Sequence, residues 1–264
     1  MSSEEIVVEK SEGIATITLN RPDRLNSVTQ KMINEDLPRI WSDLEHDKKV
    51  RCIIFTGAGE RSFCSGMDVK EAASSPTWGK QPVQPRKQMI TSRQAGVTKP
   101  VIAAVNGICA GGGQMFVSDC DIAIASTSAT FFNPGVSIGQ LAVYAPITWS
   151  KYVSFQSLMR MMLVGSAERL SAQQAKELGI ITEVVPAAGL ITRSRELAEM
   201  IAANSPTAVR QVKKILWDCL DRNLADSFTN GQAIMRAYMG HPDSIEGPKA
   251  FAEKRKPNWS EEQS

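Results

Sequence analysis

Residues 99–113, KPVIAAVNGICAGGG, combine a short buried strand with three consecutive glycines, and the following QMFVSDC opens an apolar helix. A strand that ends in glycines and leads into a helix gathers unpaired backbone N–H groups at one point. The helix dipole adds partial positive charge there. Such a point binds a phosphate or stabilises an oxyanion that develops during a reaction. A tight turn without any ligand is the plainer alternative.

The residues around the glycines argue against a phosphate loop. No Lys-Ser/Thr pair follows them, and GGGQMF is not a GxGxxG dinucleotide fingerprint. A second strand exit punctuated by glycines, GAGERSFCSGMDVKE, occupies residues 57–71. If the two strands are neighbours, these loops can aim two N–H donors at one oxygen. The pair of loops therefore favours an oxyanion site.

Length and charge restrict the class of protein. The chain has 264 residues, of which 42% are hydrophobic, which suffices for one large core or one domain with a helical appendage. Thirty Lys and Arg against 28 Asp and Glu give a formal net charge of +2, which is no basis for a nucleic-acid or membrane partner. The start, MSSEEIVVEK, has neither an apolar leader segment nor a basic amphipathic pattern. We therefore expect a cytoplasmic protein.

The cysteines and histidines give no pattern for a metal or disulfide site. There are five cysteines, without a CxxC pair, and most of them lie in apolar or glycine-rich surroundings. His46 and His241, the two histidines, are far apart in the sequence. Reduced, buried thiols and no metal centre are the expectation.

The apolar pattern alternates between strands and helices and then becomes helical. Residues 29–46 have helical spacing, although Pro38 should bend this helix or reset its start. Residues 72–88 contain three prolines and no periodicity, so we expect a surface loop, followed by a helix up to Lys99. Further strands are expected at 50–57, 100–107, 121–126 and 180–185, and helices at about 145–163, 171–178, 190–203, 207–220 and 224–239. This order predicts an α/β layered fold with a helical C-terminal part.

Six stretches together resemble the crotonase superfamily, also called the enoyl-CoA hydratase/isomerase family. They follow the order of that family and cover nearly the whole chain, whereas any one alone is a weak signal. The stretches are NRPDRLNSV (20–28), GAGERSFCSGMDVKE (57–71), KPVIAAVNGICAGGG (99–113), CDIAIASTSATF (120–131), LSAQQAKELGIITEVVP (170–186) and DSIEGPKAFAEKRKPNW (243–259).

The resemblance implies a fold and an assembly. The family fold is a spiral of strand-strand-helix turns, followed by a helical region that forms trimers. Trimers of the family commonly pair into hexamers. Carried onto this chain, residues 1–200 form the acyl-CoA-binding core and residues 201–264 the C-terminal helical region.

The resemblance also implies a substrate and two donors. Family members bind acyl-coenzyme A thioesters, many of them in fatty acid metabolism, and stabilise a thioester enolate with two backbone N–H groups. By motif, those donors are the N–H groups of Met67 and Gly112. Coenzyme A belongs to the substrate, so no separate cofactor is implied. The matched CoA-binding positions are Arg24, Leu25, Asp68, Val69, Lys70, Phe251 and Lys254, the last two often reaching the ligand across a subunit boundary.

This sequence departs from the family pattern where the acid–base groups should stand. Family hydratases use two glutamates, and the matching positions here are Met115 and Gly135. A slip of one residue would place Gln114 at the first position, but an amide is no base either. Isomerases generally keep the second glutamate, and the aspartate of the dehalogenases falls at Val143. Naphthoate synthases also have glycine at position 135, but their serine and aspartate fall at Gln140 and Ala142.

Asp119, Gln140 and Tyr144 are the tentative replacements. Asp119 lies four residues after Met115, on the same helix face, and could act as a base. Tyr144 could donate a proton, and Gln140 could hold a water molecule. The structural alternative is that Asp119 caps or covers the surface and the other two pack an interface. Met115 itself would form an apolar wall that weakens hydration but accepts an acyl chain.

We therefore expect an enzyme of the lyase or isomerase class that acts on an acyl-CoA thioester through an enolate. Thioester hydrolysis and C–C cleavage are alternative reactions. A non-catalytic acyl-CoA-binding protein is the alternative from another class. The loop 72–88 and the aromatic residues Phe116, Phe131, Phe132 and Trp149 are expected to select the acyl group.

Overall fold

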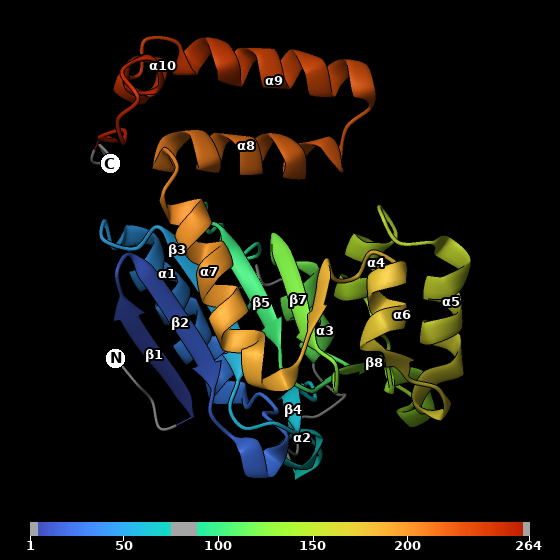
Figure 1. Cartoon of the computed structure of the whole chain (residues 1–264). Coiled ribbons are helices and arrows are strands. Elements are labelled where there is room, and N and C mark those ends of the chain that lie inside the picture. Colours follow the sequence, from blue (N-terminus) through green and yellow to red (C-terminus); the bar gives the residue numbers. More distant parts are fainter. Residues whose placement is uncertain (1–4, 75–88, 261–264) are drawn as a thin grey trace.

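The computed structural model describes residues 5–74 and 89–260, and the largest sheet in this part of the chain has six strands (Figure 1). Their order is β1-β2-β3-β5-β7-β10; β1 is antiparallel to β2, and the other neighbours are parallel. The strands are β1 Ile6–Ser11, β2 Ile14–Leu19, β3 Cys52–Gly57, β5 Val101–Val105, β7 Ile122–Ser126 and β10 Glu183–Val185. The expected strands are thus confirmed.

A smaller sheet, which the sequence did not predict, lies beside the first. Its order is β4-β6-β8-β9, with β4, β6 and β8 parallel. Its strands are β4 Ser62–Cys64, β6 Ile108–Ala110, β8 Thr130–Phe132 and β9 Leu170–Ser171. Strands β3, β5 and β7 of the large sheet are each followed in the chain by a strand of the small one. This alternation is the expected spiral of strand-strand-helix turns.

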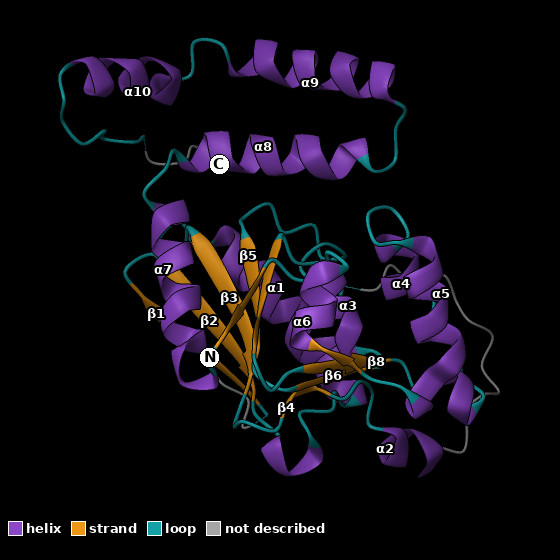
Figure 2. Ribbon diagram, turned by 45° about the vertical axis from the view of Figure 1, so that its right-hand side comes forward, coloured by secondary structure: helices purple, strands orange, loops and turns teal. Residues whose placement is uncertain are grey.

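Helices complete the turns of the spiral and then form the C-terminal part (Figure 2). They are α1 Leu37–His46, α2 Val69–Ser74, α3 Gly113–Ser118, α4 Tyr144–Trp149, α5 Phe155–Val164, α6 Ala172–Glu177, α7 Leu190–Ala202, α8 Pro206–Cys219, α9 Leu224–Tyr238 and α10 Pro242–Ala252. None of the described helices is long and apolar enough to cross a membrane. Pro38 resets the first helix as expected, because α1 begins at Leu37 after a π-helical segment.

The parallel strands are buried on both faces, which explains their continuous apolar sequence. Along β3, side chains alternate between faces. Ile54 belongs to the cluster that includes Leu190 of α7, whereas Phe55 belongs to the larger core on the other face. The ring of Phe55 stacks on Trp41 of α1 and on Phe116 of α3, with centroids 5.8 and 4.6 Å apart. This packing fixes α3, and with it the glycine loop, against the sheet.

Two helical predictions were wrong. The expected helix at 145–163 is broken into α4 and α5 by turns around Ser150 and Ser154. The segment before Lys99 forms only hydrogen-bonded turns within residues 89–99, and Gly96, with φ +74°, lies near their end. Side chains of Thr91 and Ser92 instead bond to Asp119, so local polar contacts replace the helix.

The last three helices lie beyond the end of α7 as a separate layer (Figures 1 and 2). Asp121 anchors α8 to the sheet: its carboxylate accepts the Trp217 indole N–H at 2.7 Å and the Val101 N–H at 2.7 Å, and Lys213 Nζ lies 2.8 Å away. Because α7 ends at Ala202, the change from spiral to helical layer falls near the expected boundary after residue 200. The division into two domains stays a prediction.

Candidate active site

A cavity of about 550 Å³ opens between the two glycine loops and the segment 133–146. Its described lining is apolar apart from uncharged polar side chains, namely Gln30, Asn34, Ser65, Asn133, Gln140 and Tyr144. None of its described lining residues is Asp, Glu, Lys, Arg or His. A neutral, largely apolar hollow of this size suits an organic ligand more than an inorganic ion.

The two predicted N–H donors both line this cavity. Met67 lies in a short parallel bridge with Val28, in which Val28 N–H donates to Gly66 O at 2.8 Å and Asp68 N–H donates to Val28 O at 2.9 Å. Backbone N–H groups alternate in direction along an extended segment, so the Met67 N–H faces away from Val28. Among the described residues, no acceptor is recorded for it.

Gly112 supplies the second donor from the start of a helix. It is the N-cap of α3, where backbone N–H groups have no partner inside the helix. The Met115 N–H donates to Gly112 O at 3.1 Å, but the Gly112 N–H has no recorded acceptor in the described part of the chain. Two unpaired donors from different loops thus border one cavity.

The glycines permit the close approach of these loops. A Cβ on Gly66, whose φ is +97°, would lie 2.8 Å from the Gly112 nitrogen. A Cβ on Gly113 would lie 2.2 Å from the Cys64 carbonyl oxygen, where no side chain fits. By contrast, a Cβ on Gly112 would make ordinary contacts, 3.5 Å from Gly66 Cα and 3.6 Å from the Met67 nitrogen. Gly66 and Gly113 thus allow the loops to come together, and Gly112 lies between them at the start of α3.

Met115 and Gly135 both line the cavity, while Gln114 does not. Gln114 is fully buried; its Oε1 accepts the Asn133 Nδ2–H at 2.8 Å, and Asn133 Oδ1 accepts the Gly135 N–H at 3.0 Å. The side chain that faces the cavity is therefore Met115. A Cβ on Gly135 would lie 2.9 Å from both Asn133 Oδ1 and Gln140 O, so this loop leaves no room for a side chain.

Asp119 lies outside the cavity lining. It is 5% exposed, and its carboxylate accepts the Thr91 hydroxyl at 2.6 Å and the Ser118 hydroxyl at 3.3 Å. Burial raises the pKa of Asp119, although the Thr91 hydrogen bond and the charge of Arg93 act in the opposite direction. Asp119 joins α3 to the turn at residues 91–92.

Gln140 and Tyr144 do line the cavity. Tyr144 begins α4 and is 43% exposed, and it also borders a neighbouring hollow of about 290 Å³ lined by Asp119 and Arg93. The backbone N–H of Gln140 donates to Gly135 O at 2.9 Å, which closes the loop around the second vacant glutamate position. Tyr144 is the titratable side chain among the described lining residues.

The aromatic residues expected to select the acyl group are only partly in place. Phe116 lines the cavity, but Phe131 and Trp149 are fully buried in the core, and Phe132 packs under the guanidinium of Arg169 at 4.3 Å. The expectation was wrong for these three. On strand β8, Phe131 belongs to the main core, whereas its neighbour Phe132 packs against Arg169. Of the loop 72–88, residues 75–88 lie outside the described part of the chain.

Exposed apolar residues of the segment 138–143 take the place of those aromatics. Ile138, Leu141 and Val143 line the cavity, and Leu141 is 89% exposed. The sequence did not predict them because this segment has neither helical nor strand periodicity. Its three aliphatic residues in a non-periodic segment could nevertheless have indicated an apolar surface that binds a ligand.

The residues predicted to bind CoA near the N-terminus lie next to the Met67 loop. Arg24 ends a short 3-10 turn, Pro22–Arg24, and Leu25 follows it with φ +52°. Asp68 Oδ2 accepts from Arg21 Nη2 at 3.0 Å, so Asp68 holds this turn to the Met67 loop. Burial favours a higher value, but hydrogen bonds from the Glu71 amide and from Arg21 hold the pKa of Asp68 below its usual range.

The remaining predicted CoA residues are exposed. Val69, 52% exposed, lines the cavity, and Lys70 follows it on α2. Phe251, on α10, is 87% exposed, and Lys254 follows that helix. Helices α2 and α10 lie at opposite ends of the molecule in both views (Figures 1 and 2), so one chain does not bring these two groups together.

Known proteins resemble this chain in sequence and in fold over nearly its whole length. The profile of the family described as enoyl-CoA hydratase/isomerase matches residues 9–262. An (E)-benzylidenesuccinyl-CoA hydratase from Thauera aromatica is 32% identical over 260 residues, which cover 96% of this chain and 97% of that protein. A short-chain-enoyl-CoA hydratase from Clostridium acetobutylicum is 31% identical over 266 residues, covering 97% of each.

A solved structure agrees with these relatives. The crystal structure of an enoyl-CoA hydratase/isomerase from Mycobacterium paratuberculosis matches with a TM-score of 0.88 at 39% identity and covers 99% of this chain and 100% of that one. Sequence profile, relatives and fold coincide over the same residues. The chain therefore belongs to the enoyl-CoA hydratase/isomerase family, which is the crotonase superfamily.

Proposed function

We propose that this protein is an enzyme that acts on an acyl-CoA thioester and stabilises the thioester enolate with the N–H groups of Met67 and Gly112. The observation that carries the proposal is the pair of unpaired donors bordering one cavity. They come from loops that glycines allow to approach closely. Donors of this kind each contribute about 3 to 4 kcal/mol to transition-state stabilisation.

The step that these donors support is loss of the α-proton. The α-proton passes to a water molecule, the C–H electron pair moves toward the thioester carbonyl, and negative charge collects on its oxygen between the two N–H groups. Return of the proton to the α-carbon reverses the step, whereas protonation at the γ-carbon of an unsaturated thioester moves the double bond. We infer that Tyr144 donates the returning proton and that the Gln140 amide holds the water molecule, because both side chains line the cavity. Asp119 lines the neighbouring hollow and accepts a hydrogen bond from Thr91. Its proposed role is therefore structural, without contact to the substrate.

Efficient hydration is not the reaction that this lining favours. Adding water across a double bond in this family relies on two carboxylates, and the positions that would supply them are Met115 and Gly135. Their apolar replacement leaves a wall suited to an acyl chain. Isomerisation, thioester hydrolysis or C–C cleavage through the same enolate remain compatible with the donors.

The CoA moiety is proposed to lie along Arg24, Leu25 and the segment 68–70, beside the oxyanion loop. Since α10 is distant within one chain, Phe251 and Lys254 would reach the adenine end from a second copy in a trimer or hexamer. No cofactor is needed beyond the coenzyme A of the substrate.

A non-catalytic acyl-CoA-binding protein is the second candidate. The absence of any carboxylate among the described lining residues favours it, because binding needs the donors and the apolar wall but no proton carrier. Both candidates predict acyl-CoA affinity, so affinity alone does not separate them.

A panel of saturated, unsaturated and aromatic acyl-CoA thioesters tests the proposal. Binding is measured by calorimetry, and turnover by mass spectrometry of the same mixtures. We expect binding of several thioesters and a change in mass for at least one. Tight binding without turnover across the panel would favour the binding protein. Absence of binding would contradict both candidates.

A further inference from the structure

A second cavity lies at the amino-terminal ends of the parallel strands of the large sheet, away from the candidate active site. Its volume is about 560 Å³, and it shares no lining residue with the first cavity. It is bordered by the residues just before the parallel strands, namely Gly13 before β2, Arg51 before β3 and Pro100 before β5. The end of α7 and the start of α8 close the other side.

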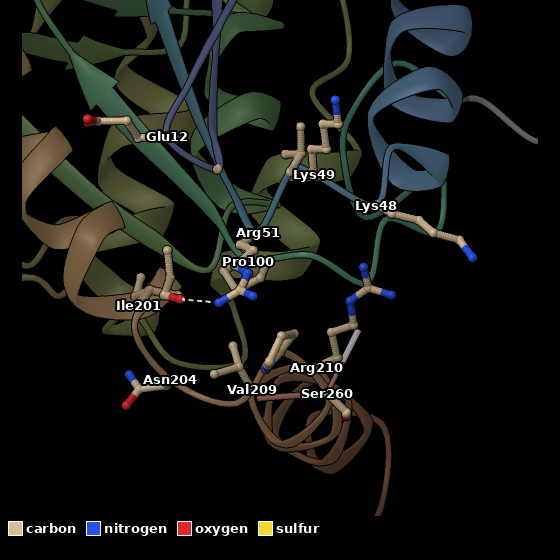
Figure 3. A pocket seen from close by; sticks show the side chains of 14 residues that line it. Glu12, Lys48, Lys49, Arg51, Pro100, Ile201, Asn204, Val209, Arg210 and Ser260 are labelled. Carbon is tan, nitrogen blue, oxygen red and sulfur yellow. Dashed lines mark hydrogen bonds between the residues drawn. The ribbon is translucent and has the colours of Figure 1, made fainter. Parts of the chain in front are cut away.

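The lining of this cavity is strongly basic. Its described lining contains the cationic residues Lys48, Lys49, Arg51 and Arg210 and one acidic residue, Glu12, so the formal charge of these described residues is 4 − 1 = +3. Glu12 Oε2 lies 2.8 Å from Arg195 Nη2, and in Figure 3 its side chain points away from the cavity. The whole chain carries only +2, so this cavity concentrates positive charge.

Arg51 is already oriented for an anion. Its Nη1–H donates to Ala202 O at 3.2 Å, and its backbone N–H donates to Gly13 O at 2.7 Å, which fix both ends of the half-buried residue. In the described part of the chain, no carboxylate is recorded within salt-bridge distance of it. A guanidinium held in this way still has N–H groups that can donate hydrogen bonds to the oxygens of a phosphate group.

Arg210 stands on the opposite wall. Its side chain is 22% exposed and lies 4.0 Å from Glu45, whose carboxylate also accepts the Thr98 hydroxyl and backbone N–H. Figure 3 shows the guanidinium groups of Arg51 and Arg210 turned toward the same space, whereas the side chains of Lys48 and Lys49 extend away from it. The positive end of the α8 dipole points to the same place.

We propose that this cavity binds a phosphate-bearing small molecule, with its phosphate between Arg51 and Arg210. The aliphatic walls formed by Pro100, Ile201 and Val209 would hold the body of the ligand. Such a ligand would contact both the starts of the parallel strands and α8. It would therefore stabilise the packing of the spiral against the C-terminal helices. This inference is independent of the proposed acyl-CoA chemistry.

Calorimetry with inorganic pyrophosphate, at matched ionic strength, tests the site in the full chain. We expect saturable binding that Arg51→Gln and Arg210→Gln each weaken by about tenfold or more, because each removes a charge-assisted fork. Arg160 lies on α5, outside the cavity, and pairs with Glu168. The variant Arg160→Gln also removes one positive charge and should leave the dissociation constant within about twofold of the parent. No saturable binding, or unchanged binding in both arginine variants, would overturn the proposal.

Two further variants keep the test decisive. If Arg51→Gln does not fold, the exposed pair Lys48→Gln and Lys49→Gln should still weaken binding severalfold. A chain ending at Ser260 lacks the acidic Glu261 and Glu262, which follow a lining residue, and should bind pyrophosphate at least as tightly. Binding that responds to Arg24→Gln but to neither arginine of the cavity would place the ion at the CoA segment and contradict the proposal.

Discussion

At the scale of single residues, Met115 and Gly135, the positions that the resemblance matches to the two glutamates, differ in how readily they could accept a carboxylate side chain. Met115 faces the cavity from α3 and has a full side chain there. Gly135 sits where a Cβ would lie 2.9 Å from Gln140 O, a backbone atom. The first position can accept glutamate by substitution alone, whereas the second requires the loop 133–140 to move.

Met115→Glu should therefore increase hydration of crotonyl-CoA by about tenfold or more over the starting protein, since a positioned carboxylate contributes at least that much. Met115→Gln, which has similar length but no carboxylate, is the matched control and should give no increase. The assay follows loss of the enoyl absorbance. Equal rates for the two variants would show that residue 115 does not face the reacting double bond.

Asp119→Asn distinguishes a base from a structural carboxylate. We expect turnover within about threefold of the parent, because Asp119 lies outside the cavity lining. Its raised pKa means that the folded state binds the proton more tightly than the unfolded chain, so its contribution to stability is full in acid and is lost as the pH rises through the folded pKa. Thermal unfolding of Asp119→Asn should thus depend less on pH above pH 4. A loss of turnover of a hundredfold in a folded variant would restore Asp119 as the base.

At the scale of elements, the patterned segments were predictable and the short ones were not. The strand at 101–105 and the helix at 190–202 have long apolar periodicity and occur as expected. The strands of the small sheet are only two or three residues long, too short for their alternation to be read from the sequence, and packing against the large sheet defines them. Helix α10 contains Pro248 and Gly247, which read as helix breakers.

The attachment of α8 depends on one side chain. Asp121 accepts the Trp217 N–H and pairs with Lys213, both on α8, and each carboxylate oxygen is engaged. Asp121→Ala should lower the free energy of unfolding by about 3 kcal/mol, since it leaves half-buried donors without an acceptor. Chemical denaturation measures this loss. Asp121→Asn, which keeps one acceptor, should lose clearly less; equal losses would contradict the anchor.

At the scale of the whole molecule, the C-terminal layer exposes a large apolar surface. Leu224, Phe228, Met235 and Met239 on and beside α9 are between 59% and 74% exposed. Contiguous exposure of this kind is uncommon in a monomer. It fits the trimer or hexamer that the family resemblance implies.

Light scattering after size-exclusion chromatography should therefore give a mass of three or six chains. The double variant Phe228→Asp and Met235→Asp should shift the mass toward one chain, because charges cannot be buried unpaired in an interface. The pair Glu196→Gln and Glu199→Gln, which changes exposed acids on α7, is the control. A monomeric parent protein would contradict this arrangement.

The two glycine loops of the candidate site were predictable, because glycine spacing and a strand-to-helix turn encode them locally, whereas the family resemblance supplied Met67 and Gly112 as the expected donors. The lining of the cavity was not, since Ile138, Leu141 and Val143 reach it through a segment without periodicity. Phe131 and Trp149 were misplaced for the reverse reason: their strand and helix turn them into the core.

Exchange of the α-proton for deuterium tests the central claim, that the N–H groups of Met67 and Gly112 stabilise an enolate. Acyl-CoA thioesters are incubated with the protein in heavy water and weighed by mass spectrometry. Gly112→Pro deletes one donor at φ −61°, an angle that proline adopts, and Gly112→Ala keeps the donor while adding a methyl group with ordinary contacts. We predict exchange by the parent and by Gly112→Ala, with at least a hundredfold loss in folded Gly112→Pro. Full exchange by folded Gly112→Pro, or none by the parent with thioesters that it binds, would contradict the account.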